Sequence, residues 1–232
     1  MPLLLDFANN AITINVRTSK KARRLRLVSS INGVEAIVPL DYRAEELQSF
    51  VSSRKDWIIK TSRYYSRLKE RCGGIEPDTI YFLGSKYHFH VVKDKKTSAV
   101  VSEAMKVITF HMADRRRFKE EMKEWYKEQI GKVIAERLPL LAGRLNMKFG
   151  KVSIKSQKSR WASRSKKGNM NFNLLLAAAP AEVIDYVIIH ELTHLVEMDH
   201  SSRFWQLVKE VDPEYKRHKE WLAIYSPVIK IS

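Results

Sequence analysis

The feature that most constrains the fold is an apolar segment that also carries three polar side chains. Residues 183–196 are apolar in nearly every helical direction, so a helix formed here is expected to lie inside the core. His190 and His194 are four residues apart and would project from one face of that helix, with Glu191 on the adjacent edge. Unpaired polar groups are costly in a buried helix, so this grouping predicts a shared use for the three side chains.

These residues form the pattern H-E-x-x-H, whose spacing suits a divalent cation. Two imidazoles on one helical face can share a zinc ion, and the intervening Glu can take a proton from a water that the zinc acidifies. We therefore predict one Zn²⁺ per chain, with His190 and His194 as ligands and Glu191 as general base. An alternative without metal is an internal hydrogen-bonded cluster of the same side chains.

A catalytic zinc usually has three protein ligands, and His200 is the best third candidate. It follows His194 at the interval seen in metzincins, provided that the chain turns at Met198 and Asp199. Glu197 stands where metzincins have glycine, and no later Met-turn is evident, so the chain does not match that group. A second interpretation is that His200 simply belongs to the cap of the next helix.

The remaining histidines are weaker candidates. His88 and His90 would lie on one face of a strand, and we expect that face to be solvated because no third ligand is evident nearby. We expect His218 to be a surface residue of the last helix, with replacement of His200 as ligand as the alternative. The single cysteine, Cys72, excludes an internal disulfide and fits a reducing, cytoplasmic compartment.

The chain is strongly basic, with 42 Lys and Arg residues against 26 Asp and Glu residues and a net charge of +16. Such a charge attracts polyanions, which include nucleic acid and anionic substrates. Residues 151–168 contain no acidic residue, and this run is either a solvated loop or a contact for an anionic partner. Trp161 would stack on a base or, as we favour, fill the core. The candidate contacts are Arg160, Trp161, Arg164, Lys166 and Lys167.

Membrane association is not expected. The longest uncharged stretch, residues 168–181, is too short to cross a bilayer and carries three Asn residues. The start of the chain has no basic region before its apolar run, so it does not resemble a signal peptide.

Hydrophobic periodicity predicts an α+β chain with a boundary near residue 112. Residues 1–112 form a β-rich N-terminal domain with one long helix that Asp41 caps and that runs to about Arg71, and residues 113–232 form a domain of helices plus a small sheet. Turns are expected at Asn32 and Gly33 and at Gly84 and Ser85. Strands are expected at about 10–18, 23–31, 34–40, 79–83, 86–92, 105–110, 151–156 and 169–173, and a long helix, with Pro139 as a potential kink or break, at 114–146.

Two stretches carry a resemblance to a known family. RWASRSKKGNMNFN (160–173) and residues 180–205, with HELTH and DHSSRFW, resemble the YgjP-like metallohydrolases, which are related to the SprT-like and WLM zincins. The N-terminal VRTSKKARRLRL also fits, so the resemblance spans most of the chain. It implies a zincin-like catalytic domain, zinc held by His190, His194 and His200, and Glu191 as catalytic acid/base. Relatives usually have Cys at the position of Arg164, a departure that concerns the substrate groove rather than the metal site.

These observations favour a zinc-dependent metallopeptidase that acts on a polypeptide, and the resemblance implies nucleic-acid-associated proteins as one substrate class. A second enzyme hypothesis is a metal-dependent hydrolase of nucleotide phosphoanhydrides, because the same metal, water and Glu could serve and a basic cleft would bind the phosphates. A third hypothesis is a nucleic-acid-binding protein with a structural metal site. Glu191 argues against the third, since a structural site does not need it.

Overall fold

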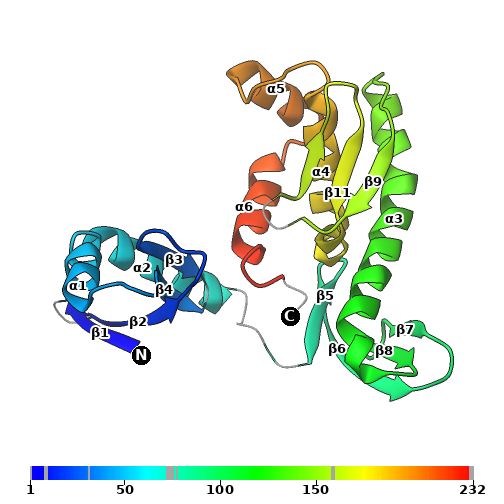
Figure 1. Cartoon of the computed structure of the whole chain (residues 1–232). Coiled ribbons are helices and arrows are strands. Elements are labelled where there is room, and N and C mark those ends of the chain that lie inside the picture. The colour runs from blue at the N-terminus through cyan, green and yellow to red at the C-terminus, as the bar shows by residue number, and fades with distance from the viewer. Residues whose placement is uncertain are drawn as a thin grey trace. The chain divides into compact units, whose positions relative to one another are not determined.

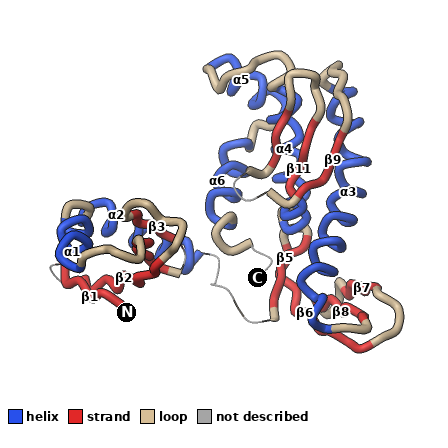
Figure 2. The backbone as a smooth tube through the Cα atoms, in the orientation of Figure 1, coloured by secondary structure: helices blue, strands red, loops and turns tan. Residues whose placement is uncertain are grey.

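The computed structural model describes residues 2–7, 10–30, 32–71, 76, 78–157 and 160–229, so Cys72 lies outside the described part. The chain divides into two compact units, Met1–Gly74 and Ile75–Ser232, each with its own hydrophobic core. Both units combine helices with small mixed sheets (Figures 1 and 2), which confirms the α+β class. Among the described residues, no helix is both long and apolar enough to cross a membrane.

The first unit is a four-stranded sheet followed by two helices. Its strands are β1 (Pro2–Phe7), β2 (Asn10–Thr18), β3 (Arg26–Ser30) and β4 (Gly33–Val38), in the order β1-β2-β4-β3 with β2 and β4 parallel. The helices are α1 (Ala44–Ser52) and α2 (Lys55–Arg71). The apolar residues of the two helices pack against side chains at alternate positions of β2 and β4. The buried residues of this core are Ile14, Val34, Ala36, Val38, Leu47, Val51 and Ile58.

The single helix expected between Asp41 and Arg71 is wrong, because the structure has two helices there. The residue before α1 is Arg43, and no side-chain hydrogen bond caps the helix, so Asp41 is not its cap. The chain turns at Ser53, whose hydroxyl donates to the carbonyl three residues earlier. A serine that bonds its own backbone competes with helix continuation. The turn still leaves Val51 and Ile58 fully buried in the same core.

The second unit starts with another four-stranded sheet. Its strands are β5 (Thr79–Phe82), β6 (Ser85–Lys93), β7 (Ser98–Ser102) and β8 (Val107–Met112). The order is β5-β6-β8-β7 with β6 and β8 parallel, which repeats the strand order of the first sheet. After a short helix, η1 (Arg115–Arg117), the chain enters α3 (Phe118–Arg144), which continues through Pro139 without splitting.

This second sheet shares its core with the helices that follow it. Phe82 and Phe110 lie 4.9 Å and 5.5 Å, centroid to centroid, from Trp125 of α3. The compact units therefore divide after Gly74, whereas the sequence places the boundary near residue 112. The change from strand to helix periodicity near residue 112 marks only the end of the sheet β5–β8. The apolar face of that sheet is buried against α3, so both belong to one core.

A third sheet and four helices complete the second unit. The sheet contains β9 (Val152–Lys155), β10 (Ala162–Arg164) and β11 (Met170–Asn173) in the order β10-β11-β9, and β10 was not expected from the sequence. Then follow η2 (Leu174–Ala178), α4 (Ala181–Thr193), α5 (Ser202–Val211) and α6 (Tyr215–Tyr225). Figure 1 shows α3 and α4 alongside this sheet, and α4 packs against both α3 and β10.

Gly84 connects the second sheet to the start of α4. It lies in the β5–β6 turn with φ +81°, and its N–H donates to the Ala178 carbonyl at 3.0 Å. A Cβ at Gly84 would lie 2.6 Å from Cγ and 3.0 Å from Cα of Pro180, the residue that precedes α4. The turn is therefore closed to any side chain.

We expect Gly84→Ala to lower the free energy of unfolding by roughly 2–4 kcal/mol, from left-handed backbone strain and overpacking together. Urea denaturation followed by circular dichroism measures this change. Gly143→Ala is the matched control, because a Cβ there meets nothing within 4 Å. Equal midpoints for the two variants would show that the contact with Pro180 carries no weight.

Candidate metal centre

The first two histidines of the site lie at the C-terminal end of α4. His190 is in the last turn of the helix, and His194 follows its end with helical dihedrals and an N–H bond to the His190 carbonyl at 3.2 Å. The four-residue spacing therefore places both imidazoles on one face. Glu191 is only 6% exposed, and its neighbours on α4 are almost all apolar and buried.

The third histidine arrives from the loop between α4 and α5. Ser201 caps α5 by accepting the N–H of Phe204 at 3.2 Å, and Asp199 accepts the N–H of Ser201 at 3.1 Å. His200 takes no part in this cap, and its Nε2 lies 3.1 Å from Nε2 of His190. One nitrogen from each of His190, His194 and His200 lies within 4.8 Å of the other two.

An aromatic framework supports the three imidazoles. Phe204 is fully buried, and its ring centroid lies 4.9 Å from His190, 4.5 Å from His194 and 4.8 Å from His200. Trp205 stacks on His200 at 5.6 Å with the ring planes 26° apart. Sequence reasoning gave these two aromatic residues no role, although the F-W pair that follows His200 on the next helix was a usable signal.

The donor set fits a tetrahedral cation. His194 Nδ1 lies 3.0 Å from the Glu197 carbonyl, so the tautomer that donates this bond leaves Nε2 free as a ligand. Two nitrogens bound to one zinc ion stand roughly 3.3 Å apart, close to the 3.1 Å between His190 and His200. His190 Nδ1 is buried and has no hydrogen-bond partner in the described part of the chain. Three convergent imidazoles suit zinc, as they also suit copper, iron or nickel.

Burial shifts the pKa values of two of the histidines and of Glu191. Burial, followed by the charges of His194, His200 and Lys219, lowers the pKa of His190 to about 3. Burial also lowers the pKa of His194. Burial raises the pKa of Glu191 to about 7, and the positive charge of Arg164 opposes that rise. Before any cation is considered, the site therefore holds a neutral His190 and a carboxyl group whose pKa is near neutrality.

The model of the family described as YgjP-like, metallopeptidase domain, matches residues 23–225 of the chain. The chain belongs to this family. The YgjP-like match extends from the first compact unit to the end of α6. Among solved structures, the chain is similar to the crystal structure of the metallopeptidase zymogen of Pyrococcus abyssi abylysin, with 29% sequence identity, coverage of 38% of this chain and 90% of that chain, and a TM-score of 0.36. No curated protein sequence matches the chain.

The five candidate substrate contacts of this YgjP-like protein lie in different surroundings. Trp161 is partly buried against the core of the second unit, and its Nε1 donates to Ser226 Oγ at 3.0 Å. Arg164 lies on β10 with Nη2 2.7 Å from Met198 Sδ, in the loop that leads to His200. Arg164 is therefore brought toward the histidines. The other three candidates are exposed, and they are Arg160, Lys166 and Lys167.

The expectation that His218 is a surface residue is wrong. His218 is only 8% exposed, and its Nδ1 lies 2.8 Å from Asp212 Oδ2, which is also buried. The Asp212 carboxylate compensates the burial of the His218 imidazole. The sequence around His218 is basic and resembles a surface helix, so it gave no sign of this partner. His88 and His90, in contrast, are exposed on β6 as expected.

Proposed function

We propose that this YgjP-like protein is a zinc-dependent metallopeptidase. His190, His194 and His200 hold one zinc ion, and Glu191 is the general base. The observation that carries the proposal is the convergence of three imidazole nitrogens within 4.8 Å of one another. Membership of a metallopeptidase family supports a metal-dependent peptidase in general, and the all-nitrogen donor set supports zinc.

The proposed mechanism assigns proton transfer to Glu191. A bound zinc ion supplies Lewis-acid chemistry, because it lowers the pKa of a water molecule and polarises a carbonyl oxygen. Glu191 lies next to a ligand on α4 and takes the proton from the attacking water, then delivers it to the leaving amine.

The polypeptide substrate is assigned to the edge strand β10. Within the described residues this strand pairs on one side only, with β11, and it packs against α4, the helix that carries His190. An extended peptide can add to such an edge through main-chain hydrogen bonds. A peptide bound in this way would have its carbonyl groups near the helix that carries the histidines, and main-chain bonding requires no particular side chain.

The first test is metal dependence and substrate class. We expect purified protein to contain about one zinc ion per chain by elemental analysis, and to cleave casein until a chelator removes the metal. Added zinc should restore cleavage, because the fold already brings the three imidazoles within 4.8 Å of one another. Phosphate release from nucleoside triphosphates without casein cleavage would favour the phosphoanhydride hydrolase. Salt-dependent DNA binding that persists in His190→Ala, with neither activity, would favour the nucleic-acid-binding protein.

A further inference from the structure

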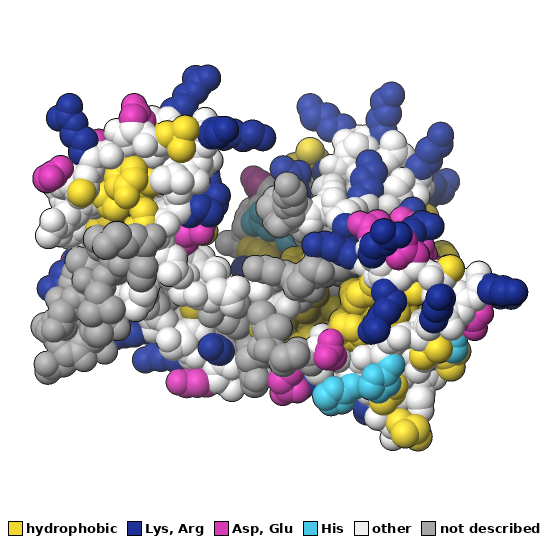
Figure 3. Space-filling view, turned by 60° about the horizontal axis from the view of Figure 1, so that its bottom comes forward, with side chains coloured by type: hydrophobic (Ala, Val, Ile, Leu, Met, Phe, Trp, Pro, Cys, Tyr) yellow, Lys and Arg dark blue, Asp and Glu magenta, His cyan; other side chains and the backbone are white. Residues whose placement is uncertain are grey.

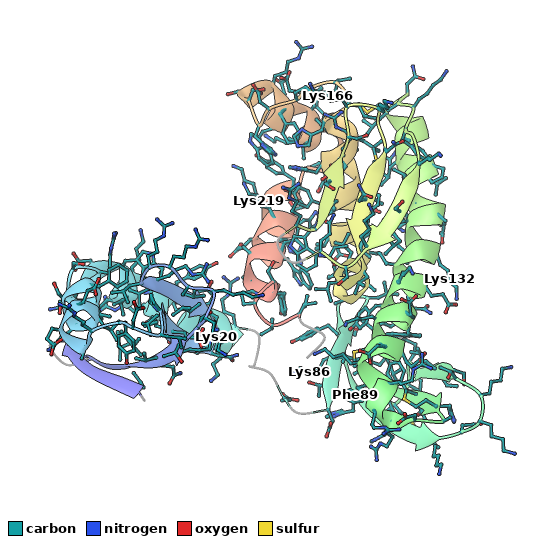
Figure 4. The ribbon with its side chains drawn as sticks, in the orientation of Figure 1. Lys20, Lys86, Phe89, Lys132, Lys166 and Lys219 are labelled. Carbon is teal, nitrogen blue, oxygen red and sulfur yellow. The ribbon has the colours of Figure 1, made fainter. Side chains whose placement is uncertain are left out.

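Lys219 of α6 is held beside the metal centre, and sequence reasoning did not select it. Its Nζ lies 4.5 Å from the centroid of the Trp205 ring, and the same ring stacks on His200. Tyr215 stacks on Trp205 at 5.4 Å with the planes 20° apart. Figure 4 labels Lys219 in the part of α6 that lies nearer α5. A cation on an aromatic face is restrained, so this ammonium group stays close to the histidines.

Arg164 brings a second positive charge from a different element. It lies on β10, and its guanidinium group contacts Met198 in the loop between His194 and His200. Both cations therefore contact side chains that flank His200. Arg164 contacts Met198, two residues before it, and Lys219 lies on the Trp205 ring that stacks on it.

Nearby acidic groups do not neutralise these charges. Within the described residues, neither Arg164 nor Lys219 forms an ion pair. Three acidic side chains around the site have other partners: Glu197 with Arg203 at 3.9 Å, Asp199 with the backbone N–H of Ser201, and Asp212 with His218. Figure 3 shows that Lys and Arg side chains are also numerous on the face of the molecule it presents.

We infer that Arg164 and Lys219 form an anion-binding subsite that selects peptides with an acidic side chain next to the scissile bond. The inference rests on the proposed function, for which it names the substrate class. Each cation is partly or fully exposed, so its attraction for a substrate carboxylate is worth about two- to fivefold in affinity. The two together favour an acidic peptide over its neutral analogue by about tenfold, and more at low ionic strength.

A binding experiment separates this inference from catalysis. Three fluorescein-labelled peptides, identical except for Glu, Gln or Lys at one position, are titrated by fluorescence anisotropy with zinc-loaded Glu191→Gln protein at low salt. The position is varied along the peptide to find the one that responds. We expect the Glu peptide to bind about tenfold tighter than the Gln peptide and the Lys peptide to bind weakest.

Charge reversal shows whether Lys219 carries the preference. On the same background, Lys219→Gln should reduce the ratio between the Glu and Gln peptides to about threefold, and Lys219→Glu should favour the Lys peptide. Lys216→Gln, an exposed site one turn earlier on α6, is the matched control and should leave the ratio unchanged. Circular dichroism of each variant verifies the fold.

The outcomes for binding and for cleavage are distinct. Equal binding of the three peptides at every position, or a preference that Lys219→Glu does not alter, overturns the subsite. A charge preference that depends on Lys219 supports the subsite, even if zinc-loaded wild-type protein cleaves none of the peptides. That absence of cleavage would overturn the proposed peptidase instead. Where cleavage occurs, kcat/KM should follow the same order of Glu, Gln and Lys.

Discussion

Replacing Glu191 with Gln is expected to lower kcat about a thousandfold while the protein keeps its zinc ion. A positioned general base contributes about 10²- to 10⁴-fold, and glutamine has nearly the same shape but cannot take a proton. Glu191 is 6% exposed and is not among the convergent nitrogen donors, so the amide fits its space without disturbing the ligands. Steady-state kinetics on a cleaved peptide and elemental analysis of the same sample measure both effects.

Glu197→Gln is the control for that result. Glu197 lies in the loop after His194 and forms a weak ion pair with Arg203 at 3.9 Å, so its charge is near the site without a catalytic assignment. We expect its kcat to stay within about twofold of wild type. Equal kcat for wild type and Glu191→Gln would remove Glu191 from its role as base and leave the metal centre to be explained otherwise.

The second large effect is expected for His200→Ala, which should weaken zinc binding at least about a hundredfold. Structural zinc sites bind with apparent free energies of about 10–16 kcal/mol, so the loss of one of three ligands costs several kcal/mol. His200 is also the proposed ligand that lies farthest from α4 along the chain, since His190 is in α4 and His194 directly follows it. Competition with a fluorescent zinc chelator gives the affinity, and the rise in Tm on zinc addition should shrink in parallel.

His90→Ala is the matched control, because His90 is exposed on β6 and lies outside the histidine cluster. Its zinc affinity should equal that of wild type. If His200→Ala also binds zinc as tightly as wild type, another group completes the site and the three-imidazole proposal fails. The buried pair of His218 and Asp212 makes His218 a poor substitute, since its Nδ1 is already occupied.

The sequence predicted correctly those helices and turns whose formation depends on residues close together in the chain. The apolar periodicity of α4 and the four-residue spacing of His190 and His194 needed no tertiary information, because helical geometry relates them directly. The β5–β6 hairpin was likewise expected, although its turn is at Leu83 and Gly84, one residue earlier. The strands missed were β1, β7 and β10, and the last has only three residues, too few to display alternation.

The errors came from interactions between distant segments. His218 was expected at the surface because its neighbours are basic, and the buried Asp212 that compensates it could not be anticipated from them. The boundary near residue 112 followed a change of period, but apolar side chains of β8 complete a core with α3. Periodicity reports which face of an element is apolar and leaves open which element covers it.

The amino-acid sequence by itself determined the buried helix, its two imidazoles and carboxylate, and the excess of positive charge. Only the tertiary structure decided that His200 meets His190, that Phe204 contacts all three rings, and that Lys219 lies on the Trp205 ring beside them. Arg164 and Lys219 are 55 positions apart along the chain, and although the sequence already made Arg164 a candidate contact, nothing in it singled out Lys219. Electrostatic interactions depend on distance through space, and folding sets that distance.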